Sequence, residues 1–163
     1  MTTAFVNGRV FIGDGRVLEH ATIIVEGDRI VKVGKGKTPV PREANKISLE
    51  EGTLFPGFID CHVHLCLDGS ADPVTTLFKD PLPTTTLKAS RLAHKTLMNG
   101  VTMVRDMGGK DGIDLCLRDA IRSGLILGPR MLVSRQMVCM TGGHGWPFAQ
   151  EADGPDEVRK AAR

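Results

Sequence analysis

Residues 58–64 read Phe-Ile-Asp-Cys-His-Val-His and follow directly on Pro56-Gly57. Alternate side chains of a β-strand point to the same face. His62 and His64 are therefore expected to project together, with Asp60 one step behind them. Two imidazoles in this arrangement can hold one divalent metal ion. The segment predicts a strand that carries a metal site at its C-terminal end.

Two other interpretations of this stretch have to be weighed. One is two unrelated histidines near the end of a strand. The other is a Cys/His zinc site, because residues 61–66 read CHVHLC. In a regular strand, however, Cys61 points away from His62 and His64. We therefore expect the paired histidines, rather than the cysteines, to be the metal ligands.

Downstream of this strand, helical and extended patterns alternate. An apolar stripe of period three to four predicts a helix from about residue 84 to residue 98, with one of Thr84–Thr86 as its cap and Asn99-Gly100 at its end. Further helices are predicted within 111–123 and 153–163, and short strands at 101–105 and 131–133. Such alternation is typical of parallel strands with covering helices.

Residues 1 to about 55 have a different character, with short β-branched runs and no helical period. Asn7-Gly8 is a dipeptide typical of a tight hairpin. The runs 21–26 and 29–33 are joined by Gly27-Asp28, and the second run offers Ile30, Val31 and Val33 for packing. We expect a small antiparallel β unit, and we place the boundary between two domains, 1–56 and 57–163, before Gly57.

The composition excludes several classes of protein. The chain has 21 Lys and Arg against 19 Asp and Glu, a net charge of +2, so it lacks the basic patch expected of a nucleic-acid or membrane-surface binder. It contains no apolar run long enough to span a membrane. Four cysteines in 163 residues are too few for a disulfide scaffold, and we expect a cytoplasmic protein.

Several motifs together resemble the metal-dependent amidohydrolase superfamily, in its branch of imidazolonepropionase-like and prolidase-like hydrolases. The first barrel strand of that superfamily resembles LFPGFIDCHVH at 54–64. Its N-terminal β-sandwich half resembles NGRV at 7–10 and IIVEGDRIVKVG at 23–34. The motifs GVTMVRD, GPR and TGGH, which begin at residues 100, 128 and 141, are similar to those of the branch.

The resemblance implies an α/β fold, a deformed (β/α)8 TIM barrel preceded by part of a small β-sandwich domain. A complete barrel takes ~250 residues, roughly 31 for each βα unit, and 57–163 is 107 residues long. We therefore expect only the first three or so βα units, and a chain that is part of a longer enzyme.

The resemblance also implies a chemistry. His62 and His64 would be ligands of the more buried of one or two divalent metal ions, with zinc as the first choice. The other ligands of the family are a carboxylated lysine, two histidines and an aspartate from later strands, which this chain lacks. The implied reaction is hydrolysis of a C–N bond in a dipeptide, an N-acyl amino acid or a cyclic amide by metal-activated water. The implied partners are a small or dipeptide-like substrate and further copies of the chain.

Three other polar positions are candidates for the site. Asp60 could accept the second N–H of a metal-bound imidazole or could bond to backbone. His144, in a glycine-rich loop, would contact the substrate in the resembled branch, and the alternative is a loop histidine facing solvent. Arg105 and Asp106 could form an ion pair with each other or could line the pocket.

A second function from a different class also fits the sequence. A truncated, non-catalytic chain could bind metal weakly or self-associate, because incomplete sheets leave open edges and apolar surface.

Overall fold

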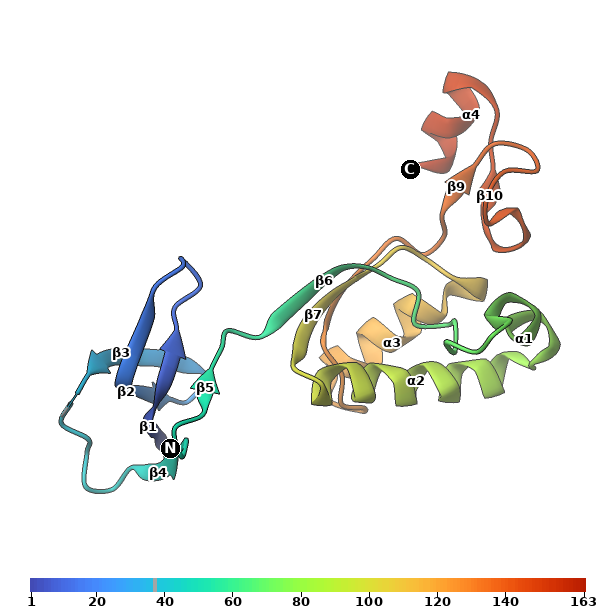
Figure 1. The fold of residues 1–163 in the computed structure, drawn as a ribbon. Coiled ribbons are helices and arrows are strands. Elements are labelled where there is room, and N and C mark those ends of the chain that lie inside the picture. Colours follow the sequence, from blue (N-terminus) through green and yellow to red (C-terminus); the bar gives the residue numbers. More distant parts are fainter. Residues whose placement is uncertain (37) are drawn as a thin grey trace. The chain divides into compact units, whose positions relative to one another are not determined.

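The computed structural model describes residues 1–36 and 38–163. The chain divides into two compact units, Met1–Pro56 and Gly57–Arg163 (Figure 1).

The N-terminal unit is one five-stranded sheet. Its strands are β1 (Thr2–Phe11), β2 (Val17–Glu26), β3 (Arg29–Lys35), β4 (Asn45–Ser48) and β5 (Thr53–Leu54). They follow the order β3-β2-β1-β4. Strand β5 also pairs with β1, but at Arg9 and Val10, further along β1 than the residues that pair with β4. The β1–β2 and β2–β3 pairs are antiparallel, as predicted, but β4 and β5 run parallel to β1. The sheet is therefore mixed, since the long connection after β3 lets the chain return before it pairs with β1.

The prediction of a hairpin at Asn7-Gly8 is wrong. Strand β1 continues through both residues, and its register with β2 shifts on each side of Gly8. Asn7 has a φ of +59°, which a β-bulge accommodates and which asparagine tolerates. A Cβ on Gly8 would lie 2.5 Å from Leu49 Cβ. The Asn-Gly pair here serves a bulge that lets the 49–52 turn approach β1.

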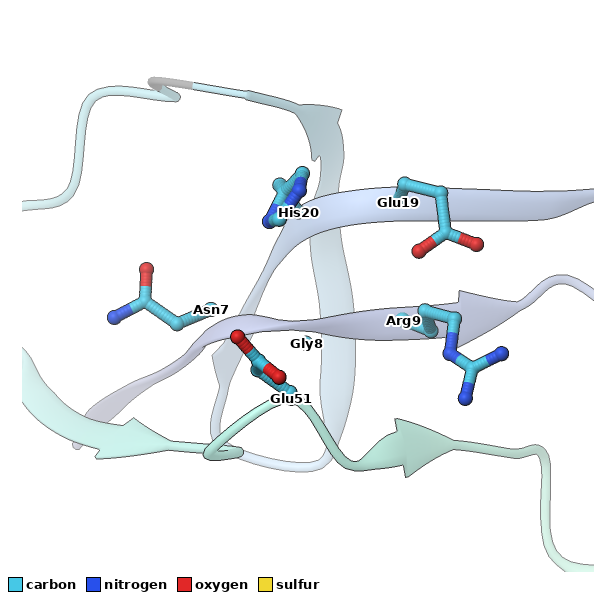
Figure 2. Close-up of a pocket in the computed structure, with 6 residues that line it drawn as sticks. All are labelled: Asn7, Gly8, Arg9, Glu19, His20 and Glu51. Atoms are coloured by element: carbon cyan, nitrogen blue, oxygen red, sulfur yellow. The ribbon is translucent and has the colours of Figure 1, made fainter.

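This bulge borders a polar hollow of about 280 Å³ (Figure 2). The Glu51 amide donates to the Asn7 carbonyl at 3.0 Å, and the Leu49 amide donates to the Val6 carbonyl at 2.8 Å. The side chains of Arg9 and His20, which also line the hollow, are exposed. The hollow is thus a surface feature formed by the turn that packs against the bulge.

The core of this unit forms around Val10, Ala21 and Ile23. Ile30, Val31 and Val33, which we predicted to pack, are 65%, 51% and 44% exposed. They belong to β3, an edge strand of the sheet, and Ile30 and Val33 border an open apolar groove of about 250 Å³. In the described part of this unit no second layer covers them.

The second unit is built on a parallel sheet in the order β6-β7-β8, as the sequence predicted. Its strands are β6 (Phe58–Val63), β7 (Val101–Asp106) and β8 (Arg130–Val133). Helices α1 (Pro73–Lys79) and α2 (Leu82–Met98) connect β6 to β7, and a short 3-10 turn, η1 (Lys110–Gly112), with α3 (Ile113–Arg122) connects β7 to β8. The register between β6 and β7 shifts between Phe58 and Ile59 and again between Asp60 and Val63, so the second irregularity includes His62.

The helix predicted from residue 84 begins two residues earlier and without a threonine cap. Pro81 is its N-cap residue and makes no side-chain cap. Pro83 lies in the first turn, where proline is favoured because its φ is already helical and its missing N–H is not needed there. The hydroxyls of Thr85 and Thr86 instead donate to the carbonyls of Pro81 and Leu82. Helix α1, capped by Asp72, was not predicted.

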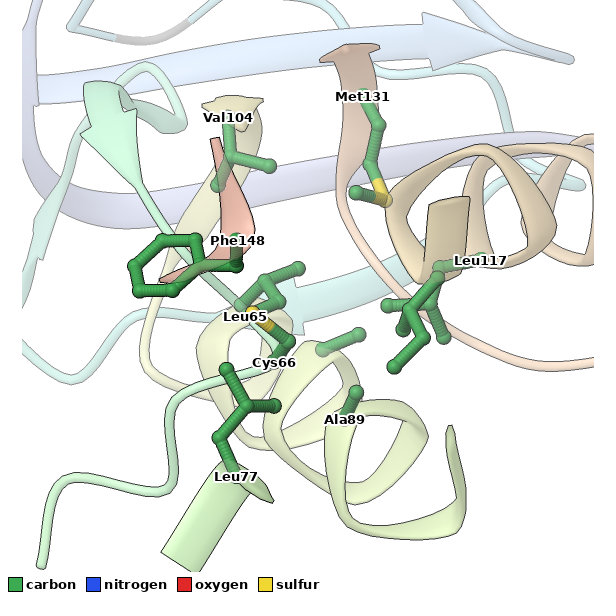
Figure 3. Packing of buried hydrophobic residues seen from close by; sticks show 10 residues of the cluster. Leu65, Cys66, Leu77, Ala89, Val104, Leu117, Met131 and Phe148 are labelled. Atoms are coloured by element: carbon green, nitrogen blue, oxygen red, sulfur yellow. The ribbon is translucent and has the colours of Figure 1, made fainter. Parts of the chain in front are cut away.

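The helices pack against one face of the sheet around Val104 and Leu117, which are 0% and 1% exposed (Figure 3). Ala89 and Ala93 lie on the buried face of α2 and are both fully buried. Because alanine has only a methyl group, α2 can approach its neighbours closely. This core fixes the ends of the three strands, where the candidate site lies.

After β8 the chain forms elements that the sequence analysis did not predict. Strands β9 (Val138–Cys139) and β10 (Gln150–Glu151) pair in parallel, and the 3-10 turn η2 (Trp146–Phe148) lies between them. Helix α4 (Gly154–Ala161) follows, as predicted, with Pro155 in its first turn. The glycine-rich loop therefore follows the short strand β9 rather than β8 directly.

Candidate metal centre

The histidine pair lies at the C-terminal end of β6. The ring centroids of His62 and His64 are 5.2 Å apart, with an angle of 72° between the ring planes. His62 lies in β6 and His64 is the first residue after it, and the two rings lie beside each other. That they share one metal ion stays a prediction. The C-terminal end of a parallel strand is also the end at which barrel enzymes place their chemistry.

The ring of His64 is fixed by one hydrogen bond. Its Nδ1 lies 2.7 Å from the carbonyl oxygen of Gly108, in the loop that follows β7. A carbonyl oxygen only accepts, so Nδ1 carries the proton and donates it. The lone pair is then on Nε2, which is the form of imidazole that binds a metal.

Asp106, the last residue of β7, is buried and binds the backbone of this loop. Its side chain is 1% exposed, and it accepts backbone N–H bonds from Leu65 and Gly108, each at 3.0 Å. Burial raises the pKa of the Asp106 carboxyl, the two backbone bonds oppose that shift, and the nearby Asp114 adds to it. Sequence reasoning placed Asp106 in an ion pair or in the pocket, and the structure supports neither.

Arg105 lies on the opposite face of β7 from Asp106. Its Nε donates to the carbonyl oxygen of Cys61 at 2.7 Å, and its side chain is exposed. Neighbouring residues of a strand point to opposite faces, so an ion pair between them is prevented by the geometry of the strand.

Of the two roles considered for Asp60, the structure has the bond to backbone. Its Oδ1 accepts the backbone N–H of His62 at 3.0 Å, and its side chain is exposed. The partner of an imidazole N–H in this site is instead the Gly108 carbonyl, which binds His64. A carboxylate two residues before a backbone N–H can bond to it locally, and the irregular pairing of β6 favours that arrangement.

His144 is exposed in the loop between β9 and η2. The residue of this segment that reaches the histidine pair is Phe148, whose ring centroid lies 6.5 Å from that of His64. The structure therefore packs a neighbour of His144, rather than His144 itself, against His64. The sequence pattern that could have pointed to Phe148 is an aromatic residue directly after Gly145-Trp146-Pro147.

The residues present fit part of a metal site. His62 and His64 supply two imidazoles, whereas a catalytic zinc usually has three protein ligands. Across residues 1–36 and 38–163, no group of three or more histidine, cysteine or carboxylate side chains converges on one point. Cys66 is 7% exposed, and burial raises the pKa of its thiol, which disfavours the thiolate that a metal needs.

Within the described residues, none of the helices is both long and apolar enough to cross a bilayer.

Comparisons with known proteins agree with these features. The model of the amidohydrolase family matches residues 53–163. An imidazolonepropionase from Micrococcus luteus is 38% identical over 56 residues, which are 34% of this chain and 14% of that protein.

Solved structures match over nearly the whole chain. A prolidase in complex with N-methylphosphonate-L-proline is 31% identical with a TM-score of 0.80, and the match covers 99% of this chain and 43% of the prolidase. A Xaa-Pro dipeptidase with methionine in its active site is 27% identical with a TM-score of 0.85, covering 100% of this chain and 44% of that one. The chain thus spans less than half the length of these relatives. With the family model matching most of its residues, the chain belongs to the amidohydrolase family.

Proposed function

We propose that the protein is a metal-dependent hydrolase of C–N bonds and that His62 and His64 hold one divalent metal ion, with zinc as the first choice. The observation that carries this proposal is the proximity of two imidazoles at the C-terminal end of β6, with ring centroids 5.2 Å apart, and the hydrogen bond from Nδ1 of His64 to the Gly108 carbonyl. Membership of the amidohydrolase family supports the reaction class.

The residues of this chain have distinct tasks in that reaction. A bound divalent ion polarises a carbonyl group and lowers the pKa of water, so that hydroxide is available near neutral pH. His62 and His64 bind the ion, and the Gly108 carbonyl keeps the proton of His64 on Nδ1. Asp60 restrains the backbone at His62. Phe148 packs against the His64 ring.

We propose that His144 contacts the substrate. A neutral imidazole in a glycine-rich loop can donate a hydrogen bond to a carboxylate or carbonyl of the substrate without displacing a metal ligand. The glycines around it let the backbone approach a ligand closely. The substrate class is a dipeptide, an N-acyl amino acid or a cyclic amide, and the prolidase and Xaa-Pro dipeptidase among the similar structures favour the dipeptide.

The architecture we propose for the whole protein is a (β/α)8 barrel. Residues 57–163 form its first three or so βα units, and residues 1–56 form the N-terminal part of a β-sandwich domain. The similar structures support this assignment, since the chain covers 43% and 44% of them. The remaining metal ligands would then come from chain outside these 163 residues.

The test is metal-dependent hydrolysis by the protein purified in its full natural length. Metal content is measured by elemental analysis, and release of product is followed for Xaa-Pro dipeptides, N-acyl amino acids and cyclic amides. Chelation should abolish turnover, and zinc should restore it. Turnover that is unchanged after complete removal of metal would refute the proposal.

A second candidate function is self-association of a non-catalytic chain in the cytoplasm. It is favoured by apolar side chains on the parallel sheet, because Phe58, Ile59 and Leu132 are 57%, 62% and 54% exposed. Sedimentation velocity of the 163-residue chain tests it. A concentration-dependent oligomer without hydrolase activity would support this function, and an inactive monomer would reject it.

A further inference from the structure

We propose that Asp106 is a positioning residue that keeps His64 ready to bind metal by acting through Gly108. This inference rests on the proposed role of His64 as a ligand. The contacts that carry it, here called the Asp106–Gly108–His64 brace, join the end of β7 to the end of β6.

The brace consists of three hydrogen bonds in sequence. Oδ2 of Asp106 accepts the Leu65 amide at 3.0 Å, and Oδ1 accepts the Gly108 amide at 3.0 Å. The Gly108 carbonyl then accepts Nδ1–H of His64 at 2.7 Å. One carboxyl group therefore fixes both the backbone next to His64 and the backbone that carries the acceptor for its ring.

Gly108 is suited to this position for a steric reason. Its φ is +96°, and a Cβ built on it would lie 2.9 Å from the backbone nitrogen and Cα of Gln136. The loop is also tied to the segment after β8, because the Ser134 amide donates to the Asp106 carbonyl at 3.1 Å and the Gly109 amide donates to the Arg135 carbonyl at 3.3 Å. The Gly108 carbonyl is therefore held in place from two sides.

The burial of Asp106 makes its role specific. At 1% exposure, water cannot replace the side chain as an acceptor for the two backbone N–H groups, and a buried donor left without a partner is costly. Loss of one carboxyl oxygen should release the loop, let the Gly108 carbonyl turn away and free the His64 ring to change its tautomer. Removing a group that orients a metal-bound histidine typically lowers metal affinity 10- to 100-fold. We therefore expect a loss of about tenfold or more here.

The test compares Asp106→Asn with Asp114→Asn as a matched control. Asp114 is 2% exposed and accepts one backbone N–H, from Arg135 at 2.7 Å. It accepts neither of the two N–H groups of the brace and reaches the loop only indirectly, through Arg135, whose carbonyl accepts the Gly109 amide. Both changes remove a buried carboxylate from the same region and keep the side-chain shape. Only the first replaces one of the two acceptor oxygens of the brace with a donor amide.

Two measurements separate positioning from a general loss of structure. Nitrogen-15 NMR of the metal-free protein reports the tautomer of His64, which should be Nδ1–H in the wild type and in Asp114→Asn and a mixture in Asp106→Asn. Zinc affinity, measured by competition with a chromophoric chelator, should fall about tenfold or more in Asp106→Asn and should stay close to the wild-type value in Asp114→Asn. Thermal midpoints are recorded for all three proteins.

An unchanged tautomer and affinity in Asp106→Asn would overturn the proposal. So would an equal loss of affinity in both variants at equal loss of stability, because that result indicates a structural effect only. If the wild type binds no zinc, the proposed function fails, while the tautomer comparison still decides whether the brace exists. If Asp106→Asn does not fold, hydrogen exchange in the wild type decides. Protected Leu65 and Gly108 amides support the brace, and rapid exchange of either amide overturns it.

Discussion

The ring of Phe148 stands edge-on to the ring of His64, with centroids 6.5 Å apart and an angle of 76° between the planes. Phe148 also contacts Phe78 of α1, at 6.4 Å between centroids. Through this residue the η2 turn folds back onto the helices and the end of β6. The segment after β9 is therefore attached to the histidine pair by an aromatic contact.

Phe148→Ala should destabilise the second unit. Phe148 is 9% exposed and belongs to the main core cluster, and replacing a buried phenylalanine by alanine costs about 3–5 kcal/mol of unfolding free energy. Trp146→Ala is the control, because Trp146 lies in the same turn but is 57% exposed. The measurement is urea unfolding of both variants. Equal losses in the two would show that Phe148 does not anchor the turn.

His62→Ala and His64→Ala should each abolish metal binding and hydrolysis in the full-length protein, because the two imidazoles are the ligands that this chain contributes. His94→Ala is the control, since His94 is an exposed residue on α2. Elemental analysis and steady-state kinetics are run on the three variants. A full metal content in His62→Ala would contradict the assignment.

His144→Ala should keep its metal and lose about ten- to a hundred-fold in kcat/KM, the effect of one hydrogen bond worth about 1–3 kcal/mol whose partner stays buried and unpaired. The same kinetics and metal analysis decide the outcome. Loss of metal comparable to that of His62→Ala would make His144 a ligand, and no change in either quantity would make it a solvent-facing residue.

Gly108→Ala should cost more stability than Gly124→Ala, although both glycines have a positive φ. At Gly124, with φ +76°, a Cβ meets no atom within 4 Å, so the cost is the left-handed conformation alone, about 1–2 kcal/mol. At Gly108 the clash with Gln136 backbone is added. Urea unfolding of both variants measures the difference. Equal costs would show that the loop relaxes freely.

Alkylation should distinguish the cysteines. Cys61 and Cys116 are exposed, whereas Cys66 is buried and its thiol pKa is raised by that burial. The thiolate is the reactive form, so native Cys66 should resist iodoacetamide under conditions that label the other two. Peptide mass mapping before and after unfolding reads this out. Rapid labelling of native Cys66 would mean that the end of β6 opens easily.

Local patterns in the sequence determined much of the second unit. The spacing of His62 and His64 places both rings at the end of β6, with centroids 5.2 Å apart, and the alternation of strands and helices specifies the parallel order of β6, β7 and β8. These features depend on residues close together in the chain, so the spacing of side chains is enough to predict them.

Tertiary contacts decided what local patterns could not. Asn7-Gly8 forms a bulge instead of a hairpin because the 49–52 turn packs against it. Ile30 and its neighbours on β3 stay exposed because they lie on a sheet edge that the described unit does not cover. In both cases the outcome depends on which segment arrives from elsewhere in the chain.

The hydrogen-bond partner of His64 is the clearest example of a contact that only the tertiary structure determines. Its acceptor, the Gly108 carbonyl, lies 44 residues away in the sequence, and a backbone carbonyl carries no side-chain signature that could be recognised. Asp106 looks in the sequence like half of an ion pair with Arg105, but the alternation of β7 separates the two side chains and buries the carboxyl. The sequence determined which residue types could bind a metal. Only the folded structure decided which backbone groups orient them, because those groups meet through the pairing of β6 with β7 in the sheet.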